Sequence, residues 1–208
     1  MIRKRSLIRR GTAVAVAGTA ALVLAACGGS GDSAAGHNGH TATSASASAS
    51  ASQGQHNAAD TAFAQGMIPH HRQAVEMADL APSRTESAEV KKLAAQIKMA
   101  QDPEIKTLSG WLTSWGEEVP AEGAMDHSAH GAGGMMTAED MGQLAKASGT
   151  VFDTAFMEMM IKHHEGAVAM AKTEEAEGAF PGAKKMADAI ITSQTAEITQ
   201  MNDLLGKS

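Results

Sequence analysis

The chain has 208 residues, a formal net charge of −6 at pH 7, 43% hydrophobic residues and a single cysteine. One cysteine excludes a disulfide within the chain and a thiolate cage around a metal. The acidic balance argues against nucleic-acid binding, which depends on basic surfaces.

The first 26 residues have the pattern of an export signal. Its basic start contains Arg3, Lys4, Arg5, Arg9 and Arg10. The apolar run at 11–26 is too short for a membrane-spanning helix, and it ends in Leu24-Ala25-Ala26-Cys27. This ending resembles a bacterial lipoprotein signal, so we expect cleavage before Cys27 and lipidation of its sulfur. The remaining protein, with a net charge of about −11 because five basic residues are lost, would be anchored to the outer face of the cytoplasmic membrane.

Residues 27–59 predict a disordered tether. They are rich in Gly, Ser and Ala and include an alternating Ser-Ala tract at 44–52. Such a composition buries too little apolar area to offset chain entropy. We expect His37, His40 and His56 to be incidental members of this tether, and a single folded domain at 60–206.

The folded part contains an internal repeat. Residues 60–78 and 153–171 are identical at 12 of 19 aligned positions, at an offset of 93 residues. Further matches at the same offset extend the repeating units to 60–112 and 153–205. Within each unit, apolar residues recur at steps of three and four, which is typical of amphipathic helices.

Each unit predicts two helices. Asp60 and Asp153 stand just ahead of the first helix of each unit, where an N-cap is expected. Pro82 and Pro181 are expected between the helices of their units. In the first unit, the Ser83-x-x-Glu86 pattern predicts a capping box for the second helix.

Two further prolines fall within predicted helices. Pro69 removes a backbone hydrogen bond, so the first helix is expected either to begin near Ile68 or to kink before the histidines. Pro103 is expected to bend the second helix. Between the units, residues 125–136 predict a Gly-rich loop, and Thr137 with Asp140 predicts a cap for a short helix to about Ala147. Two helical hairpins that cannot bury their apolar stripes alone predict an all-α, four-helix bundle.

A set of imidazoles and thioethers recurs on one face of the first helix of each unit. At 100° per residue, these side chains share a stripe about 120° wide. The candidate metal ligands are Met67, His70, His71 and Met77, then Met160, His163, His164 and Met170. Thioether sulfur is a soft ligand that favours Cu(I), and imidazole suits copper in either oxidation state. The pattern therefore predicts a copper site, with Gln101, Glu104, Gln194 and Glu197 as candidates to orient the imidazoles.

A second group of potential ligands lies in the Gly-rich segment. It consists of Met125, His127, His130, Met135 and Met136. We treat these residues as an auxiliary metal-catching set.

The repeated motifs resemble the DUF305 family of exported bacterial proteins. The pattern Asp-x-x-Phe, Met-Ile-x-His-His and Ala-Val-x-Met-Ala, followed by Gln-x-x-Glu-Ile, occurs in both units. Lys162 departs from it, since the family often has Pro there. The resemblance implies a ferritin-like helical bundle and, for some members, copper binding and copper resistance. It assigns the motif positions of this chain to the eight His and Met residues named above.

Two other functions stay open. A carboxylate-bridged di-iron or di-manganese oxidase would share the architecture, but it requires Glu three residues before His, and those positions hold Met67, Ile68, Met160 and Ile161. A structural or partner-binding surface lipoprotein would use the same stripe only as core. We expect a non-enzymatic copper-binding protein, whose partners are copper, the membrane and either a second copy or a copper-transfer protein.

Overall fold

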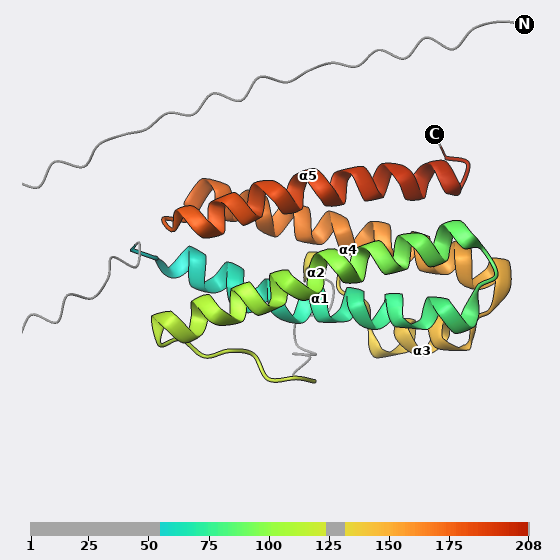
Figure 1. Ribbon diagram of the computed structural model, residues 1–208, viewed down its shortest axis with the longest axis horizontal. Helices are drawn as coiled ribbons and strands as arrows, with labels where there is room; N and C mark the ends of the chain where they lie inside the picture. The colour runs from blue at the N-terminus through green and yellow to red at the C-terminus, as the bar shows by residue number, and fades with distance from the viewer. Residues whose placement is uncertain (1–54, 124–131, 208) are drawn as a thin grey trace, which may run out of the picture. The chain divides into compact units, whose positions relative to one another are not determined.

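The computed structural model describes residues 55–123 and 132–207 (Figure 1). This part of the chain is helical and contains no strand. The α-helices are α1 (Ala58–Arg84), α2 (Ala88–Trp115), α3 (Ala138–Lys146), α4 (Gly149–Glu177) and α5 (Pro181–Leu204), and a 3-10 turn, η2, covers Ala132–Gly134. The predicted all-α fold is confirmed. The export signal, Cys27, His37, His40 and most of the tether lie outside the described residues.

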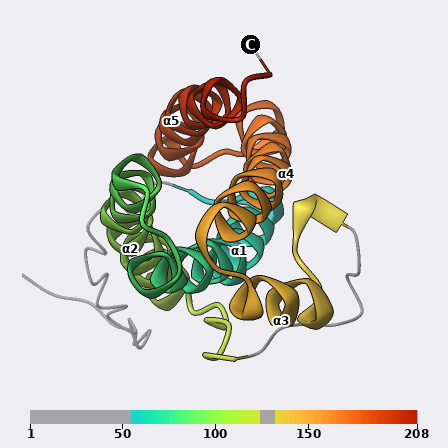
Figure 2. The same cartoon turned by 90° about the vertical axis from the view of Figure 1, so that its right-hand side faces the viewer.

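The four long helices form two hairpins that pack into a bundle. Helix α1 packs along α2, and α4 packs along α5, while the two hairpins meet mainly through α1 and α4. Seen along its length in Figure 2, the bundle has the four long helices around a common interior, with α3 outside beside α1 and α4. The predicted four-helix arrangement is therefore present, with α3 as an addition to it.

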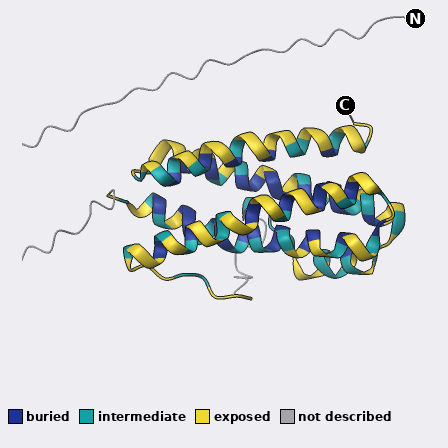
Figure 3. Cartoon of the chain, in the orientation of Figure 1, coloured by how far each residue is buried: buried dark blue, intermediate teal, exposed yellow. Residues whose placement is uncertain are grey.

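The interior is lined by the apolar stripe of each helix (Figure 3). One cluster contains Phe152, Phe156 and Leu93, and the other contains Phe63, Leu108 and Ile190. Between them the buried residues also include histidines and glutamines, which is unusual for a core because polar groups lose their hydration on burial. No helix of the described residues is both long enough and apolar enough to cross a bilayer.

Three predicted N-caps are wrong. Helix α1 is capped by Asn57, with Asp60 at the third helical position completing a capping box. Helix α2 is capped by Ser87, not by the Ser83 and Glu86 pair. Helix α4 starts after Ser148, so Asp153 lies inside it. The cap of Thr137 and Asp140 on α3 is confirmed.

Three of the prolines lie inside the long helices of the first hairpin. Helix α1 is continuous through Pro69, so the expected start near Ile68 is wrong. It also includes Pro82 near its end, so the expected position of Pro82 between the helices is wrong as well. Pro103 likewise lies inside α2. Only Pro181 stands at a helix boundary, as the first residue of α5, where the missing N–H would have had no intrahelical partner.

The last residues assigned to the tether are ordered against the bundle. Ala58 and Ala59 belong to α1. The imidazole of His56 stacks on the indole of Trp115, with ring centroids 4.4 Å apart. His56 is therefore part of the packed surface at this end of the bundle.

Candidate metal site

Helices α1 and α4 run antiparallel and bring the two His-His motifs together. The side-chain amide of Asn57, at the start of α1, donates to the carbonyl of Glu177, at the end of α4. Midway along both helices, the rings of His70 and His163 lie 3.7 Å apart between centroids and are tilted by 42°. His70 is 2% exposed, and His71, His163 and His164 are completely buried.

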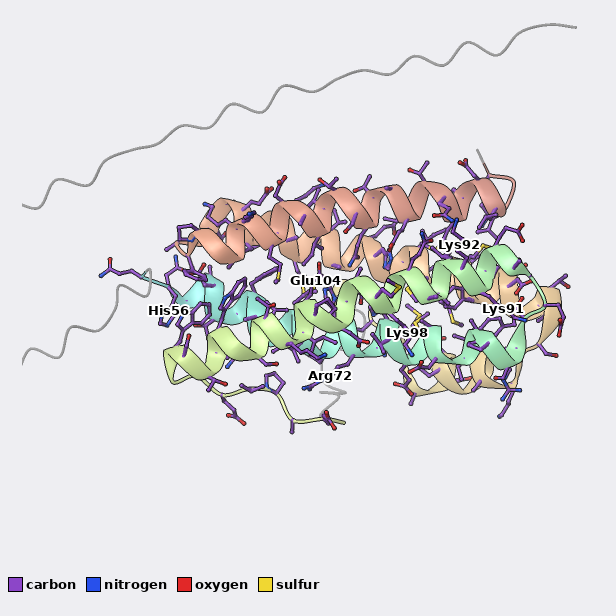
Figure 4. The ribbon with its side chains drawn as sticks, viewed as in Figure 1. His56, Arg72, Lys91, Lys92, Lys98 and Glu104 are labelled. Carbon is purple, nitrogen blue, oxygen red and sulfur yellow. The ribbon has the colours of Figure 1, made fainter. Side chains whose placement is uncertain are left out.

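His71 and His164 have equivalent carboxylate partners. The Nε2 of His71 lies 2.7 Å from Oε2 of Glu104, and the Nε2 of His164 lies 2.6 Å from Oε2 of Glu197. Figure 4 marks Glu104 midway along α2. A carboxylate accepts, so each imidazole donates from Nε2, and in the neutral form of the ring Nδ1 carries the lone pair. Both Nδ1 atoms are buried and have no hydrogen-bond partner within the described residues.

The glutamines predicted to assist these pairs do not contact the histidines through hydrogen bonds. Gln101 and Gln194 are buried at equivalent positions of α2 and α5. In the part of the chain that the structure describes, their Oε1 atoms have no partner. Each buried acceptor without a donor lowers the stability of the folded protein. The two glutamines also add to the polar content of this part of the interior.

His70 and His163 differ from each other although they occupy the same motif position. The Nε2 of His70 lies 2.7 Å from the carbonyl oxygen of Gly133, and its Nδ1 has no partner among the described residues. For His163, neither ring nitrogen has a partner in residues 55–123 and 132–207. One imidazole of the facing pair is therefore held by the backbone, and the other is not.

Burial keeps the facing pair neutral. It lowers the pKa of His70 to about 3, with repulsion from His71 and His164 adding to the effect and the hydrogen bond to Gly133 opposing it. Burial also lowers the pKa of His163 well below its ordinary value, helped by repulsion from the other three histidines. A neutral imidazole keeps a lone pair that can ligate a metal, so both rings are in the ligating form at neutral pH.

The methionines lie on both sides of the histidine layer. Met77 and Met160 belong to one core cluster, while Met67 belongs to the other, against which Met170 packs. Each side thus combines one methionine from each repeat, as the antiparallel packing of α1 and α4 requires. Met67, Met77 and Met160 are fully buried, so their sulfur atoms are available only to a group inside the bundle.

The auxiliary set is only partly described. Met125, His127 and His130 lie outside the described residues, whereas Met135 and Met136 are half-buried. Met136 packs against the core cluster that contains Met77 and Met160.

The donors of the interior are imidazoles and thioethers. Among the described residues, no three His, Cys, Asp or Glu side chains converge in a geometry that would hold an ion. Hard cations prefer several carboxylate oxygens, whereas soft ions accept imidazole and thioether ligands. The donor set therefore fits a soft ion better than a di-iron or di-manganese centre.

Sequence reasoning missed the residues that hold His70 of the facing pair. Gly133 supplies the acceptor for His70, and the amide of Gln73 forms two hydrogen bonds with the backbone of Met136. A methyl group at Gly166 would overlap the Gly133 carbonyl, so only glycine permits this approach. The sequence does carry a signal for these residues. At the offset of 93 residues Gln73 is equivalent to Gly166, so the two repeats differ at this position.

Comparisons with known proteins agree with this architecture. The profile of a family described as a domain of unknown function, DUF305, matches residues 60–205. A candidate secreted DUF305 protein from Streptomyces coelicolor is 34% identical, with a TM-score of 0.64 over 72% of this chain and 93% of that one. A DUF305 fragment from Deinococcus radiodurans is 28% identical, with a TM-score of 0.65 over 73% of this chain and 98% of that one.

CopM in its Cu(II)-bound form is 39% identical to this chain, with a TM-score of 0.61 over 70% of this chain and 94% of that one. CopM is also known in Cu(I)-bound, Ag-bound and apo forms. No curated protein matches this chain. The chain belongs to the DUF305 family.

Proposed function

We propose that this protein binds copper outside the cytoplasm and sequesters it or passes it on, without catalysing a reaction. The observation that carries this proposal is the buried histidine layer, in which all four Nδ1 atoms lack a hydrogen-bond partner within the described residues. Burying four Nδ1 atoms without a hydrogen-bond partner costs free energy that an ordinary core would avoid. A bound soft ion would recover that free energy.

The donor set and the relatives support copper in particular. Methionine sulfur favours Cu(I), and the buried methionines lie on both sides of the histidines. CopM, at 38% identity, is known with Cu(I). The proposed ligands are those predicted from the sequence: His70, His71, His163 and His164 with Met67, Met77, Met160 and Met170. Met125, His127, His130, Met135 and Met136 are proposed as an auxiliary set.

The proposed location follows from the first 27 residues. Their pattern supports export, cleavage before Cys27 and attachment of a lipid to its sulfur. Residues 28–54 would then separate the bundle from the membrane, and copper would be exchanged with a second copy or with a transfer protein. Mass spectrometry of Cys27 in protein isolated from the membrane fraction tests the lipid attachment.

Copper titration tests the function. The purified protein and a variant with His70, His71, His163 and His164 all changed to Ala would compete for Cu(I) with a chromophoric chelator. We expect the variant to lose at least tenfold in affinity, whereas Met99→Ala, which removes an exposed thioether on α2, should bind like the wild type. Equal Cu(I) affinity in the wild type and a quadruple variant that is still helical by circular dichroism would rule out the proposed site.

A further inference from the structure

A short backbone segment crosses the contact between α1 and α4 next to the histidine pair. We call residues 133–136 the strap. The η2 turn, which contains the first two residues of the strap, packs mainly on α4. The strap is held at Gln73 of α1 and Gly166 of α4, which are equivalent positions of the two repeats. Figure 2 shows η2 beside α4, on the same side of the bundle as α3.

Gln73 fixes one end of the strap by hydrogen bonds. Its Nε2 donates to the carbonyl oxygen of Met136 at 2.8 Å, and its Oε1 accepts from the amide of Met136 at 2.7 Å. The side chain is 1% exposed. Both polar ends of a buried amide are thus satisfied by one backbone residue, which fixes its position on the helix.

Glycines fix the other end by close approach. A methyl group at Gly134 would overlap the carbonyl oxygen of Lys162, and one at Gly166 would overlap the carbonyl oxygen of Gly133. Gly133 and Gly134 also have φ values of 75° and 78°, a region that side chains disfavour. The strap backbone therefore lies directly on the backbone of α4 at the turn that carries His163.

The result of both attachments is the hydrogen bond between His70 and Gly133. A backbone carbonyl only accepts, so Nε2 of His70 must carry the proton, and Nδ1 keeps the lone pair. This is the same arrangement that Glu104 and Glu197 give to His71 and His164. For His70, the backbone acceptor replaces the carboxylate.

We propose that Gln73 is a positioning residue for the metal site: by holding the strap on α1, it keeps the Gly133 carbonyl on His70 and fixes the tautomer that presents Nδ1 as the ligand. Groups of this kind orient ligating imidazoles, and their loss commonly lowers metal affinity by about 10–100-fold. The effect on copper rests on the proposed function, whereas the effect on the His70 tautomer does not.

Two substitutions displace the strap by different means. Gln73→Met keeps a side chain of similar volume but removes both hydrogen bonds to Met136. Gly166→Ala leaves Gln73 intact and pushes the Gly133 carbonyl away. Gly110→Ala is the matched control, because a methyl group on this exposed α2 glycine would meet nothing within 4 Å.

The tautomer of His70 is read from the ¹⁵N shifts of its ring in the metal-free full-length protein at neutral pH. We expect a single Nε2–H tautomer in the wild type and in Gly110→Ala, and a mixture in both strap variants. In chelator competition, the Cu(I) affinity of the strap variants should be about tenfold weaker. Thermal unfolding checks that each variant is folded.

The outcomes separate the two proposals. If His70 keeps a pure Nε2–H tautomer in folded Gln73→Met and Gly166→Ala, the role of Gln73 is overturned, whatever the copper affinity. If the tautomer changes as expected but the wild type binds no copper, the positioning role stands and the proposed function fails. If both strap variants change the tautomer and weaken copper binding together, both proposals are supported.

Discussion

The residues of the histidine layer are chemically unequal although their motif is repeated. Three imidazoles have an oxygen next to Nε2. In His163, both ring nitrogens are buried and without a partner among the described residues. Burying a polar group without a hydrogen bond costs about 1–3 kcal/mol in proteins. His163 is therefore a proposed copper ligand that lowers the stability of the metal-free protein.

This cost predicts that His163→Leu stabilises the metal-free protein. The substitution fills a similar volume and removes two unsatisfied nitrogens, so we expect the free energy of unfolding to rise by about 1–3 kcal/mol in urea titrations. His164→Leu is the control, because it is equally buried but would leave Glu197 without its hydrogen bond and should destabilise. If both variants lost stability alike, His163 would be an ordinary core residue.

Local sequence signals predicted the helices well but their starting residues less well. Spacing of apolar residues predicted the long helices, and Thr137 with Asp140 predicted the cap of α3. The caps of α1 and α4 were not predictable, because several polar residues precede each helix and tertiary contacts select among them. Asn57 looked like part of a polar tether, yet it caps α1 and also donates to Glu177 on α4. Asp60, the expected cap, accepts instead from the amides of Ala179 and Phe180.

At the start of α1, Asn57→Ala should therefore reduce stability. Loss of an N-cap side chain costs about 0.5–2 kcal/mol, and here the hydrogen bond to Glu177 is lost as well. Ser148→Ala is the matched control, since Ser148 precedes α4 but forms no capping hydrogen bond, and it should change the urea midpoint little. Equal effects of the two substitutions would show that Asn57 does not contribute as a cap.

Over the whole molecule, the sequence repeat predicted the symmetry but not the departures from it. Equivalent positions give the two His–Glu pairs. The strap has no counterpart, because it belongs to the segment between the repeats, and it distinguishes His70 from His163. The second departure is a pair of buried acids, Asp60 on α1 and Glu174 on α4; the position equivalent to Glu174 is Ala81. Features that occur once cannot be inferred from a repeat.

This acid pair makes stability depend on pH. Burial raises the pKa of Glu174 to about 8, with the adjacent Asp60 carboxylate adding to the effect and Lys184 opposing it. Burial also opposes ionisation of Asp60, but the neighbouring Glu174 side chain and hydrogen bonds from the amides of Asn57, Phe180 and Ala179 outweigh it and lower the pKa of Asp60 below 3.8. The contribution of Asp60 is lost only as the pH falls below 3.8, whereas that of Glu174 changes at higher pH.

The folded protein retains the Glu174 proton that the unfolded chain releases above the ordinary pKa of 4.5. The free energy of unfolding should therefore fall between pH 5 and 8, by at most about 1.4 kcal/mol per pH unit from this group. Glu174→Gln imitates the protonated acid and should flatten the profile over that range. Urea unfolding of the wild type, Glu174→Gln and the exposed control Glu175→Gln at pH 5, 6.5 and 8 measures the difference. Parallel profiles for the wild type and Glu174→Gln would mean that Glu174 is already ionised in the folded protein, and that the contact between α1 and α4 accommodates two adjacent carboxylates.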